Sequence, residues 1–395
     1  MVLTDTAAPP QGASVFDALS LAATAADEIL VGTARDTHRA VARRIHGVVG
    51  LGLGRAAAPV EALHQGIAGA VYGGLGLALR GSSRGFDKMA AAGAGPRLED
   101  DVRGRFVSSA VNGLIGDELL RERPQLAIPM AVRIDGHDVP IDRDTLAATF
   151  PEATGRLVVF LHGLCENESY WGYFRERTGT TYGEALAAQG WSPVYLRANT
   201  GLPIRQNGVE LAGLLRDLVA SWPVPVERIA LVGHSMGGLI MRAATNVLET
   251  DGPAWTDRLT DVVTLCAPHR GAPIAWGIGH GSRFLALLPE TSAFGKILDR
   301  RSEGVRDLVD GYVDELPPLK EARYRLVAAT LTKSARHPVG NYVGDYLVRP
   351  HSAVGRDKRG AELFPDAEVL HVGSTDHFGV LNHPEVLHAL ERWLA

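Results

Sequence analysis

The sequence has too few cysteines and too little basic charge for several protein classes. It contains two cysteines in 395 residues, Cys165 and Cys266, and neither lies in a C-x-x-C or metal-ligand spacing. Two cysteines cannot build a disulfide framework, so we expect free thiols and no bound metal. The formal net charge is −5. Nucleic-acid-binding proteins carry a basic footprint, so this charge argues against that class.

Long hydrophobic runs are also absent. The longest apolar stretch, residues 66–79, is rich in glycine. It is shorter than the roughly 20 residues that a membrane-spanning helix needs. The opening segment MVLTDTAAPPQGASVFDALS lacks a basic segment followed by an apolar one, so we expect no signal peptide. These absences predict a cytoplasmic protein, with peripheral association with a membrane left open.

The residues that are present divide the chain into two parts with different patterns. Residues 14–120 carry apolar and small residues at three- and four-residue steps, which predicts helices, and Pro59 suits the first turn of one of them. We therefore expect an N-terminal helical region, residues 1–120. Three roles fit this region: a layer packed on the rest of the protein, an interfacial membrane anchor, or an oligomerisation element.

From about residue 126 short runs rich in β-branched residues predict strands. These runs are 127–134, 156–163, 192–199, 228–235, 261–268, 324–331 and 368–375. Helical patterns occur between or after them at 207–222, 237–249 and 383–395. Strand alternating with helix predicts an α/β domain over residues 121–395, built on a mostly parallel, doubly wound sheet.

Two serines fit the pattern G-x-S-x-G, and their contexts differ. Ser83 lies in GSSRG after a glycine-rich helical stretch, and we interpret it as a loop or helix-end residue. Ser235 lies in GHSMG, after the strand IALV and before a helix. A sharp turn between strand and helix presents a serine hydroxyl at the carboxyl edge of a sheet. We therefore predict Ser235 as a nucleophile.

A serine hydroxyl needs a base to become nucleophilic, and the base follows later in the chain. His377 comes in the short loop just after the last predicted strand, where it can reach Ser235. His371 lies within that strand and His383 precedes Pro384 at a helix start, so both are predicted to be structural. His377 is therefore the predicted base.

The acid that orients the base should follow an intermediate strand. Asp345 comes after a glycine in the loop that follows the strand at 324–331, and it is the first choice. Asp376 adjoins His377, but neighbours in sequence rarely point at each other, so it ranks second. Aspartates 307, 310 and 314 belong to a helical insertion and are set aside.

An oxyanion formed during acyl transfer needs backbone N–H donors. The loop FLHGLCENESYW, residues 160–171, ends an earlier strand, and we predict the amide of Leu164 as one donor. The amide of Met236, at the start of a helix, is the predicted second donor. His162 and Gly163 are expected to border the substrate, with His162 bracing the turn rather than moving protons.

The insertion at about residues 272–322 is longer than a connection requires. It carries Trp276, Phe284 and Leu288. We expect a cap or lid over the site whose apolar residues bind an acyl group. Ordinary packing of these residues against the core is the alternative.

With these residues in place, the chain resembles the α/β-hydrolase superfamily, and within it bacterial triacylglycerol lipases and GPI inositol-deacylase-like lipases. The similar stretches are FLHGL, GHSMGGL, TLCAPHRGAP, GDYLVRPHSA and HFGVLNHPEV, between about residues 125 and 395. The resemblance implies a triad of Ser235, Asp345 and His377 with oxyanion donors at Leu164 and Met236. Cys266-Ala267 departs from the threonine or glycine-threonine common in the family.

The expected function is hydrolysis of apolar acyl esters through an acyl-enzyme, without metal or organic cofactor. The same triad also suits an acyltransferase or a thioesterase. A non-catalytic binding or membrane-scaffold protein is the third alternative. The expected partner is a small-molecule or lipid ester and no nucleic acid, with the N-terminal helices as a candidate peripheral membrane attachment; the sequence does not set the oligomeric state.

Overall fold

The computed structural model describes residues 13–25, 27, 58–248, 254–272, 302–310, 316–357 and 359–395. The described residues form two compact units, and the chain passes from the first to the second between Gly104 and Arg105. This division falls earlier in the chain than the boundary expected at residues 120 and 121. Compact units need not be domains, so the domain boundary at residues 120 and 121 stays a prediction.

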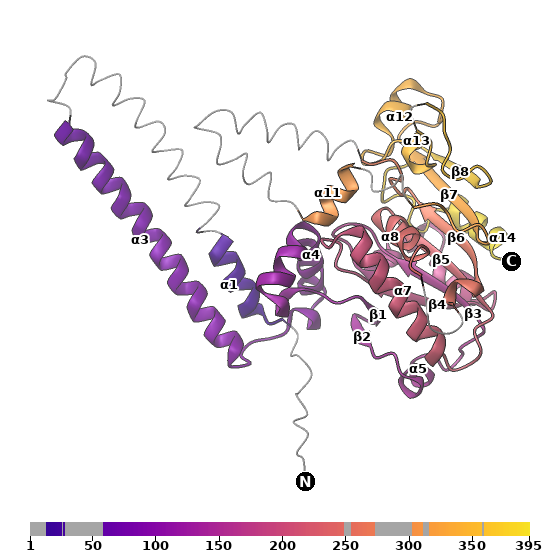
Figure 1. The fold of residues 1–395 in the computed structure, drawn as a ribbon, viewed down its shortest axis with the longest axis horizontal. Helices are drawn as coiled ribbons and strands as arrows, with labels where there is room; N and C mark the ends of the chain where they lie inside the picture. The colour runs from indigo at the N-terminus through magenta and orange to yellow at the C-terminus, as the bar shows by residue number, and fades with distance from the viewer. Residues whose placement is uncertain are drawn as a thin grey trace, which may run out of the picture. The chain divides into compact units, whose positions relative to one another are not determined.

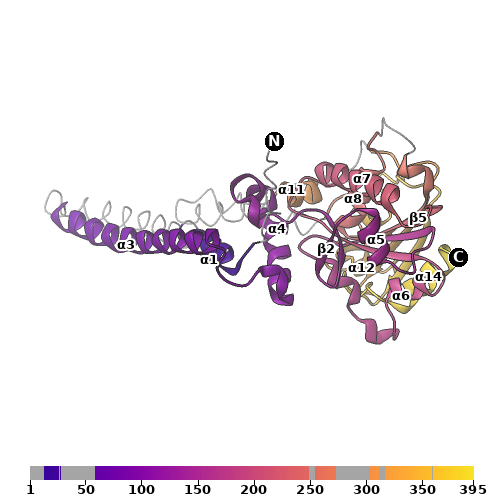
Figure 2. The ribbon, with the colours of Figure 1, turned by 90° about the horizontal axis from the view of Figure 1, so that it is seen from below.

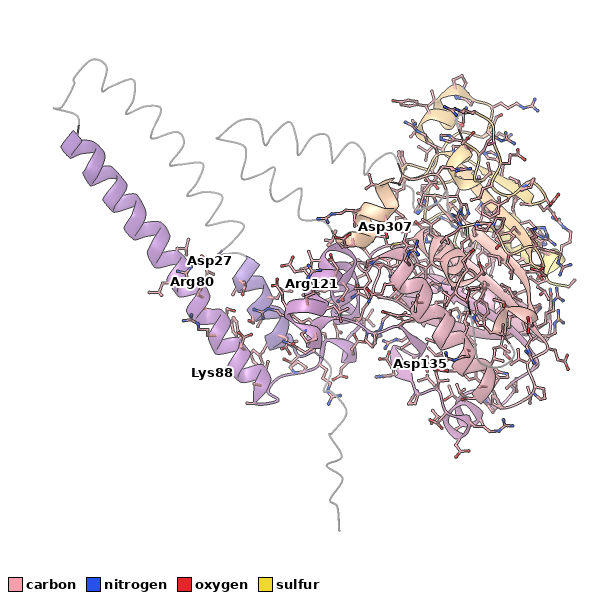
Figure 3. All side chains as sticks on the ribbon, viewed as in Figure 1. Asp27, Arg80, Lys88, Arg121, Asp135 and Asp307 are labelled. Carbon is pink, nitrogen blue, oxygen red and sulfur yellow. The ribbon has the colours of Figure 1, made fainter. Side chains whose placement is uncertain are left out.

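The first unit contains two helices that lie side by side, α1 (Val15–Ala25) and α3 (Ala58–Ala91) (Figure 1). Pro59 is the second residue of α3, as expected for a proline in a first helical turn. Arg80 of α3 forms an ion pair with Asp27, with 2.6 Å between the nearest nitrogen and oxygen (Figure 3). The helix expected around residues 34–52 lies outside the described residues.

Ser83 lies in the middle of α3, so its interpretation as a loop or helix-end residue was wrong. Its hydroxyl is buried between the two helices, 2.9 Å from Ser20 Oγ and 3.0 Å from Thr24 Oγ1. Ser20 in turn donates to Asp87 over 2.5 Å. The flanking glycines suggested a break, but packing against α1 keeps the segment helical because tertiary contacts override weak helix propensity.

The second unit is built on one mixed sheet. The described residues form eight strands in the order β2-β1-β4-β3-β5-β6-β7-β8 (Figure 1). They are β1 (Ala131–Ile134), β2 (His137–Val139), β3 (Arg156–Leu161), β4 (Ser192–Arg197), β5 (Arg228–His234), β6 (Leu259–Leu265), β7 (Arg323–Thr330) and β8 (Glu368–Gly373). β1 is antiparallel to β2 and β4, and the other pairs are parallel.

The strand order reverses at β3, which lies between β4 and β5. Open α/β sheets bind ligands outside the carboxyl ends of the strands at such a switch point. A ligand-binding site is therefore expected at the loops after β3 and β5.

Helices cover both faces of the sheet, as Figure 2 shows. In β5, Ile229 and Leu231 pack into the core beneath α7 (Ile204–Ser221) and α8 (Met236–Ala244). Ala230 and Val232 of the same strand face the other core, under α6 (Tyr182–Ala187) and α14 (Pro384–Trp393). Burial on both faces explains why the central strands are continuous apolar runs.

The other helices of this unit lie at the sheet edges and in the loops. They are α4 (Val102–Glu122), α5 (Arg143–Thr149), α11 (Glu303–Asp310), α12 (Pro338–Val343) and α13 (Pro350–Ala353). Short 3-10 turns occur at Leu98–Asp100 in the first unit and, in the second, at Pro124–Leu126, Glu168–Gly172, Arg175–Arg177 and Trp255–Arg258. No described helix combines the length and the apolarity required to span a membrane.

α11 is the helix that the structure describes within the expected cap, and it hydrogen-bonds to the start of α7 and to the loop before it. The N–H of Ile204 donates to Asp307 Oδ2 over 2.8 Å, and the N–H of Gly304 donates to Gly201 O over 3.0 Å. A Cβ on Gly304 would lie 2.2 Å from the carbonyl oxygen of Thr200. Residues 273–301 and 311–315 of the insertion lie outside the described residues, so the cap itself stays a prediction.

The predicted α/β fold with a mostly parallel sheet is confirmed. All seven predicted strands are present, and Pro384 opens α14 as expected. β2 was missed because its three residues carry no apolar run. α7 begins at Ile204, before the expected start at residue 207.

Candidate active site

Ser235 occupies a strained turn between β5 and α8. Its backbone has φ 52° and ψ −122°, a region that residues with side chains rarely adopt. The flanking glycines make the turn possible. A Cβ on Gly237 would lie 2.4 Å from the carbonyl oxygen of Leu161, and one on Gly233 would lie 2.6 Å from the nitrogen of Gly238. This strand–turn–helix geometry is that of a nucleophile elbow.

His377 and Asp345 meet at the same edge of the sheet. His377 follows β8, Asp345 follows β7, and His377 Nδ1 lies 2.9 Å from Asp345 Oδ2. The N–H of His377 also donates to the carbonyl oxygen of Asp345 over 3.0 Å. Asp345 Oδ1 accepts hydrogen bonds from the amides of Leu347 and Val348 at 3.0 and 2.8 Å. The carboxylate is thereby fixed against the imidazole.

The charge state of Asp345 follows from competing effects. Burial acts to raise the pKa of its carboxyl, but the hydrogen bond and charge of His377 and the two amides outweigh burial. The pKa therefore lies below its ordinary value, and Asp345 is a carboxylate near neutral pH. Its burial keeps water from competing for the imidazole.

The residues that were weighed as alternatives to Asp345 and His377 make other hydrogen bonds. Asp376 Oδ1 accepts from the amides of Phe378 and Gly379 in its own turn, at 3.1 and 2.7 Å. His371 lies in β8 and hydrogen-bonds across to the neighbouring strand, and His383 is the N-cap of α14. Asp345 is thus the acid that contacts His377.

Two backbone amides lie beside Ser235. A Cβ on Gly163 would be 2.9 Å from Ser235 Cβ, so the loop after β3 runs directly against the serine. The next amide is that of Leu164, and the amide of Met236 follows Ser235 at the start of α8. Neither amide has an acceptor among the described residues. Two such donors beside a nucleophile can stabilise a tetrahedral oxyanion.

His162 braces this loop from inside. Its Nδ1 lies 2.9 Å from Gly163 O, and its Nε2 accepts from the N–H of Ala198 at 3.1 Å. Burial lowers the pKa of His162, in agreement with a neutral ring. The ring is fully buried with both nitrogens engaged, so its geometry favours bracing the turn over the predicted contact with substrate.

Sequence reasoning missed a second buried pair, Glu166 and His234. Glu166 Oε2 accepts from the N–H of Gly163 over 2.9 Å and lies 3.0 Å from His234 Nδ1. His234 Nε2 lies 3.1 Å from the carbonyl oxygen of His377. In the sequence Glu166 stands three residues after Gly163 and His234 directly precedes Ser235, but nothing in the sequence shows that the two side chains meet.

α4 also supports the loop after β3. A Cβ on Gly113 of α4 would lie 2.8 Å from the backbone nitrogen of Cys165, so the helix and the loop touch through their backbones. Asn167 Nδ2 donates to Ser109 Oγ over 3.4 Å. The sequence could not predict this contact, because α4 and the loop after β3 are far apart along the chain.

One group of side chains in the described part of the chain resembles a metal site. Donor atoms of Cys266, Asp345 and His377 lie within 4.8 Å of one another. Burial and the charge of Asp345 raise the pKa of the Cys266 thiol well above its ordinary value. Thiolates, not thiols, bind metals, and Asp345 and His377 already bond each other, so this group fits a hydrogen-bonded cluster better than a metal centre.

The remaining thiol is also unreactive. Burial and the neighbouring Glu166 raise the pKa of Cys165 to about 11, so it stays protonated near neutral pH. Both cysteines are free, as predicted. Trp276, Phe284 and Leu288, the other predicted substrate-binding residues, lie outside the described residues.

The chain is similar to known ester hydrolases. Residues 151–296 match the family model described as "Putative serine esterase (DUF676)". The matched segment contains Ser235, Leu164 and Met236 and ends before Asp345 and His377. No curated protein sequence matches the chain.

Several solved structures share part of the fold. The mature lipase BlEst2 of Bacillus licheniformis is 22% identical, with 61% of this chain and 92% of that chain covered and a TM-score of 0.42. The esterase Pf2001 of Pyrococcus furiosus is 15% identical (62% and 82% covered, TM-score 0.39). The metagenomic carboxyl esterase MGS0156 is 16% identical (72% and 94% covered, TM-score 0.38). At this level of likeness they add nothing to the assignment of individual residues.

The sheet with its reversal at β3, the strained serine after β5 and the family match agree with one another. The segment that carries the strained serine, residues 151–296, is therefore similar to a family of putative serine esterases.

Proposed function

We propose that the chain hydrolyses apolar carboxylic esters through a triad of Ser235, His377 and Asp345. The observation that carries this proposal is the buried hydrogen bond between Asp345 and His377, at the sheet edge where Ser235 follows β5. A serine nucleophile needs a base, and the base needs an orienting acid. The chain supplies all three in loops that follow β5, β7 and β8.

In the proposed reaction Ser235 Oγ attacks the ester carbonyl while His377 takes the hydroxyl proton. The amides of Leu164 and Met236 bind the oxyanion of the tetrahedral intermediate, and each donor contributes about 3 kcal/mol by analogy with measured oxyanion holes. His377 then gives its proton to the departing alcohol, which leaves an acyl-enzyme on Ser235. Water, deprotonated by His377, releases the acid, while Asp345 stabilises the imidazolium.

An exposed aromatic group beside His377 supports an apolar substrate. The ring of Phe378 lies 5.6 Å from that of His377 and 6.2 Å from that of Tyr170. The Tyr170 ring is in turn 4.5 Å from the ring of Tyr173, with the two rings tilted. Phe378 and Tyr173 are 37% and 40% exposed. Exposed aromatic rings next to polar catalytic groups are typical of sites that bind apolar ligands.

The test is hydrolysis of p-nitrophenyl esters of short, medium and long fatty acids. We expect turnover by the wild type, none by Ser235→Ala, and normal turnover by Ser83→Ala, which removes the other G-x-S-x-G serine from the helix pair. Full activity of Ser235→Ala would remove the proposed nucleophile. The chain-length optimum would measure the size of the acyl site.

An acyltransferase or thioesterase would use the same three residues. Adding an alcohol acceptor to the assay, and replacing the ester by a thioester, distinguishes these reactions by their products. Exclusive formation of a transfer product in water would overturn hydrolysis as the main activity.

We also propose that α3 associates with membrane surfaces. Leu75 and Leu77 are 50% and 65% exposed, and Cβ atoms added at Gly73, Gly74 or Gly81 would meet nothing within 4 Å. Exposed leucine side chains on a helix favour an interfacial location. Flotation of the full chain with liposomes, with Leu75→Ser/Leu77→Ser as the control, tests this; equal flotation of both proteins would contradict it.

A further inference from the structure

Two buried ionisable side chains next to the site take no part in the proposed chemistry. Glu166, in the loop after β3, is 3% exposed, and His234, the last residue of β5, is fully buried. Burying an ionisable pair is costly unless its members are paired and hydrogen-bonded. The hydrogen bonds of Glu166 and His234 offset the free-energy cost of burying them.

The hydrogen bonds fix the protonation state of His234. Its Nδ1 faces Glu166 Oε2 at 3.0 Å, and its Nε2 faces the carbonyl oxygen of His377 at 3.1 Å. Both partners are acceptors, so both ring nitrogens must carry a proton. A neutral imidazole has a single N–H and would leave one contact without a proton. The geometry therefore requires an imidazolium at His234.

The surrounding charges agree with this assignment. Burial acts to lower the pKa of His234, but the charge and hydrogen bond of Glu166, the carbonyl of His377 and the charge of Asp345 together raise it. Burial acts to raise the pKa of Glu166, but the charge and hydrogen bond of His234 and the amide of Gly163 outweigh burial and lower it. The two residues form an ion pair.

The pair connects three parts of the proposed machinery. At one end Glu166 holds the amide of Gly163, the residue before the predicted donor Leu164. At the other end His234 holds the backbone of His377. The His234 ring also lies 4.8 Å from the His377 ring, and His234 adjoins Ser235 in the chain.

We propose that Glu166 and a protonated His234 are positioning residues that hold the loop after β3, which carries the predicted donor Leu164, and the loop of His377 in place around Ser235. This inference rests on the proposed function. It goes beyond the triad because neither side chain needs to touch the substrate.

Glu166→Gln separates charge from shape. Glutamine has nearly the same size, but it removes the charge that keeps His234 protonated. A neutral His234 can then donate to only one of its two partners, so one loop is released. A displacement of about 1 Å in a catalytic group costs about 10²-fold in rate. We expect kcat to fall about 10- to 100-fold while KM changes by less than about threefold, because substrate contacts are unchanged.

The kinetic test compares four variants of the full chain on a p-nitrophenyl ester. Glu166→Gln and His234→Asn should each lower kcat, and the double variant should be no worse than about the worse single one, because both remove the same link. Asp261→Asn is the matched control. Asp261 is a fully buried carboxylate paired with Arg228 in the same unit but at the amino end of β6, and its loss should lower thermal stability without changing kcat.

The spectroscopic test needs no destabilising variant. In the wild type with ¹⁵N-labelled histidine, one imidazole should remain doubly protonated above the ordinary histidine pKa of 6.5. Its signal should be absent in His234→Asn and neutral in Glu166→Gln. If Glu166 had only a structural role, Glu166→Gln would not change both the protonation state of His234 and kcat.

The outcomes separate the two proposals. If Ser235→Ala retains activity, the proposed function fails. If Ser235→Ala is inactive but His234 is neutral in the wild type, or Glu166→Gln keeps full kcat, the positioning pair alone is overturned.

Discussion

Replacing Gly237 with alanine tests whether the contact between the serine turn and the end of β3 sets the geometry of the site. The added Cβ would lie 2.4 Å from the carbonyl oxygen of Leu161 and 2.6 Å from that of His162. Both atoms belong to the backbone that leads into the loop after β3, so the contact cannot be relieved by rotating a flexible side chain.

The size of the effect follows from these distances. Restoring a tolerable contact of 3.0–3.4 Å to Leu161 O requires a displacement of about 0.6 to 1.0 Å. Over-packing of this kind costs about 1–3 kcal/mol in stability. A shift of about 1 Å between Ser235 and the amide of Leu164 should lower kcat by about 10²-fold.

The assay is ester hydrolysis together with thermal unfolding. Gly213→Ala is the matched control, because Gly213 lies within α7 and a Cβ there meets nothing within 4 Å. It should leave kcat unchanged and raise stability by about 0.5–1 kcal/mol. Wild-type kcat and stability in Gly237→Ala would refute the reasoning.

Three further expectations concern single residues. Asp345→Asn should lower kcat by about 10⁴-fold, the loss measured for a triad of this type. Asp376→Asn should keep kcat within a few fold. Equal losses in the two variants would contradict the assignment of Asp345 as the acid. The pKa of Asp345 lies below 3.8, so its contribution to stability is present above that pH and lost as the pH falls through the lowered pKa. Urea titrations below pH 3.8 should therefore show a steeper loss of unfolding free energy in wild type than in Asp345→Asn, and parallel curves would count against this. Ser83→Ala should destabilise the helix pair by about 1–2 kcal/mol through its lost bonds to Ser20 and Thr24 without altering kcat, which circular dichroism and the ester assay measure together.

The position of Ser235 could be predicted because its signals are local. A short apolar strand, two glycines and a following helix lie within about a dozen residues, and steric exclusion around the turn explains why glycine is needed on both sides. The parallel sheet was predictable for a similar reason, since strands covered on both faces must be continuous apolar runs.

The pairing of the acid and the base depended on tertiary structure. Asp345 and Asp376 were both candidates, and only the return of the loop after β7 to the loop after β8 brings the carboxylate of Asp345 to His377. Asp376 is nearer in sequence, but its carboxylate bonds the amides of its own turn.

The sequence by itself determined seven of the eight described strands and the residue in the strained turn, because each depends on neighbouring residues. Tertiary structure alone decided which distant groups meet. The buried Ser83 hydroxyl of α3 hydrogen-bonds to Ser20 of α1, and Glu166 hydrogen-bonds to His234 at the end of β5. Such contacts depend on which loops the strand order brings together, and no local pattern of residue types contains that information.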